Sequence, residues 1–509
     1  MSVAPDSLDP AVGHTTRALE ADWLVYTPLL TYAHAAGVGG TQLIPGLAVD
    51  LPTITDGGKS YTLMLRKGLV YSSGRLVKAS DFTWAVERAV KLSWAGSRQF
   101  ITSRIDGATA FAQGRDKTIA GITANDATGQ ITIRLTAPYG PFENVLAFPS
   151  MAPVPPATPF TNEQSSPPPG VGPYRISKVV VGQSFSLVKN ARWARMKIPG
   201  IPAGHLEIDV RVSGDLEANA SSVLRNTADV FDWADRIPSD LQARIEHLAS
   251  DRYSTRVMNG TDLIFLNVTR KPFSSQLARE AVLTGLDENT IKRLSSGTLL
   301  PGCHFLPPSM YGHLGARCPD RGAGLGGNLA AAKALVKRSR MAGTRVTVWS
   351  GAGSPFREWM AYYTSLLDRI GFKATQKLIR DAGYYATIGD LKLHPQTGFA
   401  DFYEDFPNPV NFYQPLTGGA IVPKGNQNWG EVNDPYLNAQ VSTLAGVPAG
   451  QLSAVVPFWH VLEGYLASKA YVAVLGYQTF PEFVSDRIDY TAIVVDPVVG
   501  FDWSSFQLK

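Results

Sequence analysis

The chain has 509 residues, of which 44% are hydrophobic and 18% are charged. This composition excludes a disordered chain, and the length exceeds what one hydrophobic core usually serves, so two or more lobes are expected. The net charge is only +4, without a Lys/Arg-rich run, so the sequence gives no electrostatic sign of nucleic-acid binding. No apolar stretch approaches the ~20 residues that span a bilayer. Residues 1–10 are polar, so the chain is either cytosolic or an exported protein supplied without its leader.

The first part of the chain, residues 41–150, reads as mixed strands and helices. Gly57 and Gly58 predict a turn before a strand at 61–65, and another strand is expected at 131–135. Between them, Ser80 is predicted to cap a helix. The apolar residues of that helix follow the 3.6-residue period: Phe82, Val86, Ala89 and Val90.

A stretch rich in Pro, Ser and Gly follows at 152–173. A strand is expected directly after it, at 174–181, so little free length remains for a disordered linker. We therefore interpret 152–173 as a surface connection between subdomains.

The clearest local unit lies at 327–377. A helix is predicted from Asn328 to Gly343, with Leu329, Ala332, Leu335 and Val336 facing inward. A strand with Val346 and Val348 on one face follows. The next helix should have Ser354 as its cap and Pro355 as its first residue. Its buried stripe should be Trp359, Tyr363, Leu366 and Ile370, ending at Gly371, before a strand at 372–377. Strand–helix–strand order predicts an α/β lobe with a partly parallel sheet.

Motifs of catalysis and cofactor binding find little support. GAGLGG at 322–327 has G-x-G-x-x-G spacing, but it follows a turn-like CPDR instead of a strand, so we interpret it as a helix entry. No G-x-S-x-G elbow, H-E-x-x-H motif or close His/Cys group is present. We therefore expect no enzyme activity, no metal and no cofactor.

The two cysteines, Cys303 and Cys318, bracket a turn-rich segment. We favour the interpretation that they form one disulfide, which would add ~3 kcal/mol to the free energy of unfolding by closing a short loop. The alternatives are two free thiols in a cytosolic protein, or a metal site that would need more ligands than His304 and His313 supply. A disulfide indicates an oxidising compartment and hence a removed leader.

The most informative segment is 399–413, FADFYEDFPNPVNFY, in which three carboxylates alternate with aromatic residues before two prolines. Aromatic surroundings are poor solvent for a carboxylate, which then needs a cation or several donors. One reading is a proline-braced ligand cradle whose carboxylate pairs with a ligand ammonium group. The other is an aromatic loop packed on its own lobe, with its acids paired to Lys or Arg.

Segments spread along the chain resemble the oligopeptide/dipeptide-type substrate-binding proteins of ABC importers, bacterial extracellular solute-binding family 5. Each segment is weak alone, and the resemblance rests on their order and spacing over nearly the whole chain. The segments are SLDPA at 7–11, LVYTPLLTY at 24–32, LIPGLAVDLP at 43–52, SYTLMLRKGLVYSSG at 60–74, KASDFTWAVERAV at 78–90, GVGPYRI at 170–176, LNVTRKPFSSQLAREAV at 266–282 and DFPNPVNFY at 405–413.

This resemblance implies an α/β, two-lobed periplasmic-binding-protein-like fold of type II with an additional subdomain. The lobes would be joined by two hinge crossings, near 257–264 and 470–478. Lobe I would be discontinuous (1–40, 171–258 and 475–509), the extra subdomain would span 41–170, and lobe II would span 259–474. The resemblance also implies a monomer at the periplasmic face or cell surface, usually lipid-anchored.

Among site residues, the resemblance points first to Asp405, four residues before Pro409, where peptide-binding members place the Asp that pairs with the peptide ammonium. Asn408 departs from the more usual acid before the proline, and Glu404 offers a competing carboxylate. Position in the expected lobes adds five further ligand-binding candidates, for whose aromatic members core packing is the alternative: Tyr403, Trp429, Asn428, Trp233 and Tyr26. Arg279 is expected to form an ion pair inside its lobe.

The expected function is reversible capture of an oligopeptide or dipeptide for an ABC permease. Lobe closure would enclose the ligand and present it to the permease. A non-peptide solute, such as an oligosaccharide or a secondary metabolite, is the main alternative. An exported hydrolase on the same scaffold is the more distant one.

Overall fold

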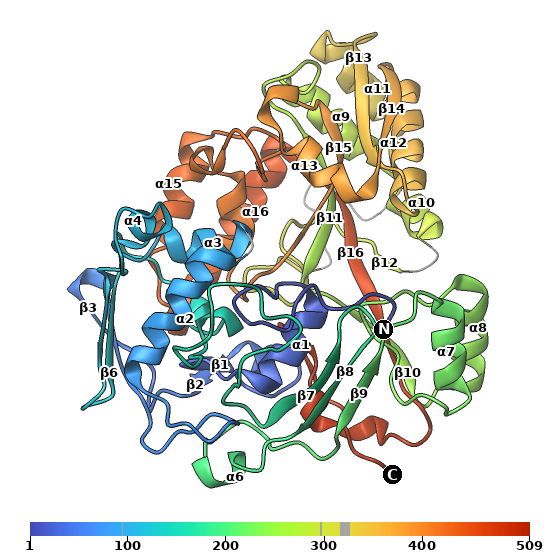
Figure 1. The fold of residues 1–509 in the computed structure, drawn as a ribbon. Helices are drawn as coiled ribbons and strands as arrows, with labels where there is room; N and C mark the ends of the chain where they lie inside the picture. Colours follow the sequence, from blue (N-terminus) through green and yellow to red (C-terminus); the bar gives the residue numbers. More distant parts are fainter. Residues whose placement is uncertain (94, 296–297, 316–325) are drawn as a thin grey trace. The chain divides into compact units, whose positions relative to one another are not determined.

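The computed structural model describes residues 1–93, 95–295, 298–315 and 326–509. The chain forms two compact units, coloured along the sequence in Figure 1. Unit 1 comprises Met1–Arg256, Gly446–Ala449 and Phe480–Lys509, and unit 2 comprises Val257–Ala445 and Gly450–Thr479. The backbone thus leaves unit 1 after Arg256 and returns at Phe480, apart from the short stretch Gly446–Ala449. Residues 41–170, expected as an extra subdomain, fall within unit 1.

Unit 1 is built on small antiparallel sheets with helices between them. A four-stranded sheet has the order β3-β4-β6-β5, and a three-stranded sheet has the order β7-β8-β9. Its strands are β1 (Leu30–Tyr32), β2 (Leu43–Pro45), β3 (Thr53–Thr55), β4 (Ser60–Met64), β5 (Ile122–Asn125), β6 (Gln130–Arg134), β7 (Tyr174–Val180), β8 (Ser184–Lys189), β9 (Ile208–Arg211), β17 (Val495–Asp496) and β18 (Gly500–Phe501). Its helices are α1 (Thr16–Val25), α2 (Ala79–Leu92), α3 (Ala95–Thr102), α4 (Ala108–Ala112), α5 (Phe142–Val145), α6 (Trp193–Met196), α7 (Leu216–Leu224) and α8 (Ser239–Leu248).

Helix α2 confirms the predicted amphipathic helix but corrects its cap. The predicted inward residues are all buried: Phe82, Val86, Ala89 and Val90. The cap residue is Lys78, whose backbone N–H donates to the Asp81 carboxylate at 3.1 Å, and not Ser80. The Ser80 hydroxyl instead donates to Asp126 at 2.9 Å, because it already lies in the first turn.

The Pro-rich connection at 152–173 contains no helix or strand and is tied to α2 by one arginine. Arg88 is fully buried, and its guanidinium donates to the carbonyl oxygens of Pro159 at 2.7 Å and Thr161 at 3.1 Å. The same guanidinium forms two bonds with Asp9, at 3.1 and 2.7 Å. Residues from the family-like segments 7–11 and 78–90 therefore hold the connection together.

The glycines of GVGPY allow a close backbone approach to the end of α1. A Cβ on Gly172 would lie 2.3 Å from the Leu24 carbonyl oxygen and 2.6 Å from that of Val25. Both atoms are backbone, so neither can rotate away. Glycine is required here by space and not by an unusual dihedral angle.

We expect Gly172→Ala to lower the free energy of unfolding by ~1–3 kcal/mol, because the added methyl group overpacks a rigid contact. Gly214→Ala is the matched control, since a Cβ there meets nothing within 4 Å. Urea unfolding of both variants checks this expectation, and equal stabilities would refute the steric account.

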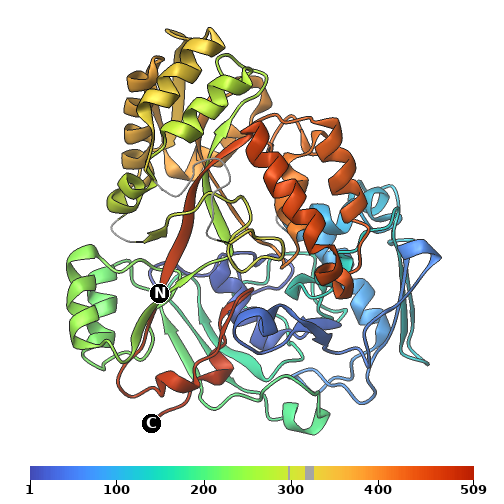
Figure 2. The same ribbon diagram turned by 180° about the vertical axis from the view of Figure 1, so that it is seen from behind.

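Unit 2 is organised on a mixed sheet with strand order β10-β16-β11-β15-β13-β14, where β12 pairs with β16. Helices α9, α11 and α12 pack against one another beside this sheet, as Figures 1 and 2 show from opposite sides. The strands of this sheet are β10 (Tyr253–Val257), β11 (Gly260–Leu266), β12 (Leu299–Leu300), β13 (Arg345–Gly351), β14 (Lys373–Ile379), β15 (Thr397–Tyr403) and β16 (Val472–Phe483). Strand β10 belongs to unit 1 except for Val257, and β16 continues into unit 1 from Phe480. The helices are α9 (Gln276–Gly285), α10 (Glu288–Leu294), α11 (Leu329–Ser339), α12 (Phe356–Ile370), α13 (Tyr384–Ile388), α14 (Pro409–Tyr413), α15 (Pro435–Leu444) and α16 (Val456–Lys469).

The predicted strand–helix–strand unit is confirmed as β13–α12–β14, with β13 and β14 parallel in register. The predicted stripe of α12 is buried throughout: Trp359, Tyr363, Leu366 and Ile370. Gly371 ends the helix with a φ of 118°. The predicted start was one residue early, because Pro355 is the cap residue and not the first helical one.

Helix α11 begins as predicted and ends earlier. Asn328 caps it by accepting the Ala331 N–H at 3.0 Å. The helix stops at Ser339 and not at Gly343, because the Ser339 hydroxyl bonds back to the Val336 carbonyl and Arg340 adopts a left-handed conformation with a φ of 58°. Of the predicted inward residues, Ala332 and Val336 are buried, while Leu329 and Leu335 remain partly exposed.

Two further features bear on the expectations. None of the helices in the described parts of the chain is long and apolar enough to cross a membrane. The GAGLGG segment lies outside the described residues except for Gly326 and Gly327.

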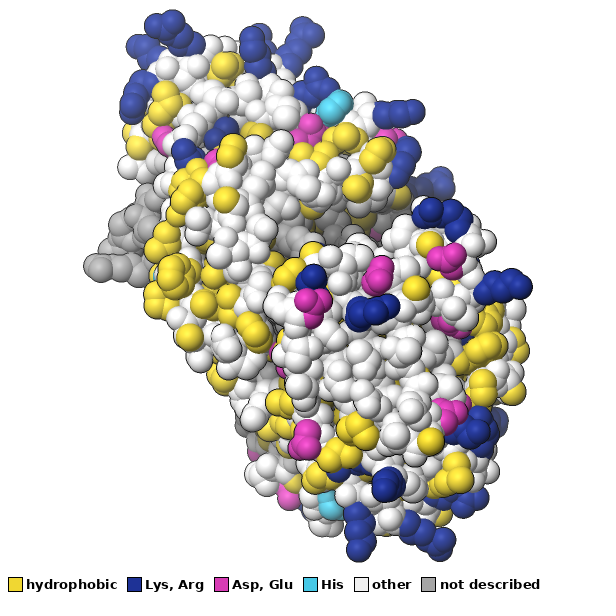
Figure 3. All heavy atoms as spheres, turned by 90° about the vertical axis from the view of Figure 1, so that its left-hand side faces the viewer, with side chains coloured by type: hydrophobic (Ala, Val, Ile, Leu, Met, Phe, Trp, Pro, Cys, Tyr) yellow, Lys and Arg dark blue, Asp and Glu magenta, His cyan; other side chains and the backbone are white. Residues whose placement is uncertain are grey.

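On the face drawn in Figure 3, Lys and Arg side chains gather at the upper end, where Figure 1 places α11 and β13.

Candidate functional site

The segment singled out at 399–413 lies in unit 2, where β15 runs between β11 and β13. After β15 the chain turns into α14, whose cap Asn408 accepts the Val410 N–H at 3.0 Å. Pro409 occupies the first helical position, where its missing N–H costs nothing. Phe406, Phe412 and Tyr413 are fully buried, so they anchor the loop 404–408 to the core of unit 2.

Asp405 is held in place by a reciprocal pair of hydrogen bonds with Asn411. The Asp405 backbone N–H donates to the Asn411 side-chain oxygen at 2.8 Å, and the Asn411 amide group donates to the Asp405 carboxylate at 2.8 Å. Burial raises the pKa of Asp405 to about 6, and the bond from Asn411 opposes this rise. No Lys, Arg or His in the described part of the chain pairs with this carboxylate. It is therefore an oriented, poorly solvated acceptor without an internal counter-charge.

We expect Asp405→Asn to stabilise the ligand-free protein by ~1–3 kcal/mol at pH 8. The folded-state pKa, about 6, lies above the unfolded value of ~3.9, so the folded protein loses stability relative to the Asn variant as pH rises through this window. The difference should be complete above pH ~6 and absent below pH ~4. Urea unfolding of both proteins at pH 8 and pH 4 measures it, and a pH-independent difference would contradict the assignment.

The other acids of this segment already have partners. Glu404 accepts a hydrogen bond from the Asn259 side chain, and its backbone N–H donates to the Asn259 carbonyl at 2.9 Å. Asp401 accepts a 2.5 Å bond from the Tyr385 hydroxyl and stands opposite Asp262 on β11.

Tyr403, a further candidate of this segment, is 36% exposed and packs on Gly260 of β11. A Cβ on Gly260 would lie only 2.4 Å from the Tyr403 ring, so even alanine at this position would force the ring to move.

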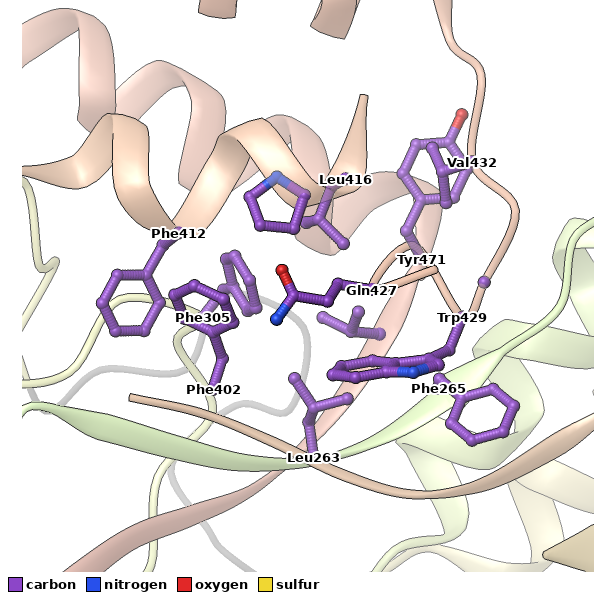
Figure 4. Close-up of a pocket in the computed structure, with 13 residues that line it drawn as sticks. Leu263, Phe265, Phe305, Phe402, Phe412, Leu416, Gln427, Trp429, Val432 and Tyr471 are labelled. Atoms are coloured by element: carbon purple, nitrogen blue, oxygen red, sulfur yellow. The ribbon is translucent and has the colours of Figure 1, made fainter. Parts of the chain in front are cut away.

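An apolar pocket adjoins the same loop and lies wholly within unit 2 (Figure 4). Its cavity volume in this structure is about 20 Å³, and it opens partly to solvent. Phe402 and Phe412 form one wall, with ring centres 5.0 Å apart, and both belong to the segment that carries Asp405. Trp429 and Gln427 lie against the pocket from a second loop. The remaining lining residues include Leu263, Phe265, Phe305, Leu416, Val432 and Tyr471.

The predicted pair Asn428 and Trp429 divides into two roles. Trp429 lines the pocket, whereas Asn428 is fully buried. The Asn428 amide group donates to the carbonyl oxygens of Thr417 at 3.0 Å and Val432 at 2.8 Å, and its oxygen accepts the Val432 N–H at 2.9 Å. Asn428 thus braces the loop that carries Trp429 and Gln427.

The remaining two candidates lie in unit 1, where their polar atoms are already bonded. The fully buried Tyr26 hydroxyl donates its one hydrogen to the Pro168 carbonyl oxygen at 2.9 Å, shared with the Leu8 carbonyl oxygen at 3.2 Å. Trp233 is 4% exposed and donates to Glu20. In this structure neither side chain offers a free polar atom, which fits the core-packing alternative, and a role in ligand binding stays a prediction for both.

Two other expectations concern Arg279 and the cysteines. The expected ion pair of Arg279 is wrong, because its guanidinium donates to the carbonyl oxygens of Phe273, Lys469 and Ala470 and lies over the Tyr471 ring. Cys303 carries a disulfide bond. Cys318 lies outside the described residues, so the pairing itself stays a prediction.

Most of the pocket could not be predicted from the sequence. The unpredicted part of its lining includes residues of β11, the loop that holds Phe305, and the start of β16. Gln427 stood next to a predicted residue, but only the Gly-rich stretch before it could have drawn attention to it.

The family described as "Bacterial extracellular solute-binding proteins, family 5 Middle" matches residues 42–423. The chain belongs to this family. The probable peptide ABC transporter periplasmic-binding protein y4tO of Sinorhizobium fredii is 27% identical over 314 residues, 58% of this chain and 54% of its own length. The probable deoxycholate-binding periplasmic protein YgiS of Escherichia coli K12 is 25% identical over 295 residues, 56% of this chain and 53% of its own length. This family member thus spans about half the length of these two curated relatives.

A third relative, the glutathione-binding protein GsiB of Escherichia coli K12, is 26% identical over 378 residues, 73% of this chain and 68% of its own length. Among solved structures, clavulanic acid biosynthesis oligopeptide binding protein 2 has a TM-score of 0.88 and 22% identity, covering 100% of this chain and 94% of its own. That likeness shows the fold and confirms the expected periplasmic-binding-protein architecture.

Proposed function

We propose that this solute-binding protein captures a peptide with a free amino terminus. The observation that supports this proposal is the Asp405 carboxylate, which Asn411 orients and which pairs with no Lys, Arg or His among the described residues. A ligand ammonium group supplies the missing charge, and a charge-assisted bond in poorly solvated surroundings is stronger than a neutral one. The names of y4tO and GsiB, which refer to a peptide and to glutathione, agree with this choice.

The apolar pocket takes an apolar group of the same ligand. Phe402 and Phe412 line the pocket and belong to the same segment as Asp405. One ligand therefore uses both the carboxylate and the pocket. Pockets of this kind tolerate different side chains because apolar contact is not directional.

The protein acts outside the cytoplasm, at the periplasmic or cell-surface side of a membrane, as a lipid-anchored monomer. It delivers its ligand to the permease of an ABC importer and carries out no chemistry on it. The family, described as extracellular solute-binding proteins, supports the location outside the cytoplasm and the role in solute binding.

A non-peptide solute is the second candidate, favoured by the almost wholly apolar lining of the pocket. The name of YgiS refers to deoxycholate, an amphipathic molecule without an ammonium group. Such a ligand would use the pocket and leave Asp405 unpaired.

Native mass spectrometry of the purified protein separates these candidates. The proposal expects co-purified peptides, seen as a series of masses released on denaturation. A single defined non-peptide mass would contradict it, and turnover of a hydrolase substrate panel would point to an enzyme instead.

A further inference from the structure

Positive charge is concentrated in one part of unit 2. Residues 329–380 carry ten Lys or Arg side chains and two carboxylates, although the whole chain has a net charge of only +4. All ten basic residues are exposed in the structure. The excess is therefore on the surface and is balanced elsewhere in the chain.

The topology brings five of these side chains to one edge, which we call the basic edge: Arg338, Arg340, Arg345, Arg369 and Lys373. In a strand–helix–strand unit, the starts of parallel strands and the ends of their helices lie on the same side of the sheet. Arg345 and Lys373 begin β13 and β14 and are register partners, ~4.8 Å apart across the sheet. The loops before these strands are bonded to each other, Gly343 N–H to the Gly371 carbonyl at 2.7 Å.

Nothing in the described chain neutralises the basic edge. None of its five members forms an ion pair with a described carboxylate, and the nearby Asp368 accepts the Ala374 backbone N–H at 2.7 Å. Arg338 and Arg369 lie at helix C-termini, where the helix dipole favours a cation. That effect does not account for Arg345 and Lys373, which stand at strand starts.

We propose that the basic edge docks the protein on an anionic phospholipid surface. Arg345 and Lys373 stand on register partners, well within one Debye length of each other, so a negatively charged plane attracts both at once. Among the described residues 329–380, Leu378 is the one large apolar side chain that is exposed. This region therefore lacks exposed aromatic side chains on which the bases of single-stranded nucleic acid could stack. Family membership places the chain outside the cytoplasm, where the membrane is the extended anionic surface at hand. The proposal does not depend on the ligand.

Vesicle co-sedimentation tests the basic edge directly. We expect the full chain to bind vesicles of phosphatidylcholine with 30% phosphatidylglycerol, to ignore pure phosphatidylcholine, and to be released by 0.5 M NaCl. The variant Arg338→Gln/Arg345→Gln/Lys373→Gln should bind roughly a hundredfold more weakly, since each such charge near the surface is worth about a fivefold change in partitioning.

The matched control is Arg175→Gln/Lys178→Gln/Lys189→Gln, which removes three exposed charges from unit 1 and leaves the same net charge. It should bind vesicles like the parent. If both variants lose vesicle binding equally, the binding depends only on net charge and the proposal is overturned. Binding to neutral vesicles, or no vesicle binding by the parent, would also overturn it. Binding of a short DNA duplex through the three residues of the basic edge, with vesicles left unbound, would also overturn it. Unchanged thermal unfolding of both variants establishes that they are folded.

Discussion

Asp405→Ala should weaken binding of a peptide with a free amino terminus by ~2–5 kcal/mol, because it removes the charged partner of a poorly solvated ammonium group. The lower end of this range is the better guide, since Asp405 is only partly buried. Isothermal titration calorimetry with a peptide that co-purifies with the protein gives the dissociation constant directly.

Two controls separate the charge of Asp405 from its shape. Acetylating the peptide amino terminus should weaken binding to the parent protein about as much as Asp405→Ala does. The same acetylation should hardly change the affinity of Asp405→Asn. Glu404→Gln should leave affinity nearly unchanged, because Glu404 is already bonded to Asn259. If Asp405→Ala retains affinity while Glu404→Gln loses it, the ammonium partner is Glu404 and the assignment made from the loop is wrong.

Periodic features of the sequence carried reliable information about the fold. The α12 stripe was predictable because residues three or four apart share one helix face, so Trp359, Tyr363, Leu366 and Ile370 could face only one way. Helix ends were less predictable, because they depend on local bonds that leave little trace in the sequence. The end of α11 at Ser339 depends on one hydroxyl bond and one left-handed arginine.

The site was predictable only where its residues are neighbours in the chain. Asp405, Phe402 and Phe412 stand in one segment, and the structure keeps them together. The pocket also draws on Phe265, Phe305 and Tyr471, whose meeting depends on strand pairing over long sequence separations. The burial of individual polar side chains could not be predicted from the sequence either. Asn428 and Tyr26 have polar groups suited to a ligand, but in the structure those groups donate hydrogen bonds to backbone carbonyl oxygens.

Arg88→Met should destabilise unit 1 by ~3–5 kcal/mol, because it leaves the Asp9 carboxylate buried without its counter-charge. Both side chains are fully buried and bonded twice. The arginine also satisfies the carbonyl oxygens of Pro159 and Thr161, so the connection at 152–173 loses its attachment to α2 as well. Urea unfolding followed by tryptophan fluorescence measures the loss.

A double-mutant cycle with Asp9→Asn shows whether the pair itself is responsible. The backbone N–H groups of Ala11 and Glu163 donate to different oxygens of the Asp9 carboxylate, at 3.1 and 3.0 Å, so Asn keeps an acceptor for only one of them but removes the buried charge. The double variant should therefore be more stable than the sum of the single losses predicts, since no buried charge remains unpaired. Arg487→Met is the control, because Arg487 pairs with Asp229 at the surface of unit 1, with side chains 57% and 40% exposed, and such a pair is worth ~1 kcal/mol or less. Strict additivity of the two single variants would mean that Arg88 acts through the carbonyl oxygens of the connection. Strong coupling would mean that the family-like segments 7–11 and 78–90 are joined by this one buried ion pair.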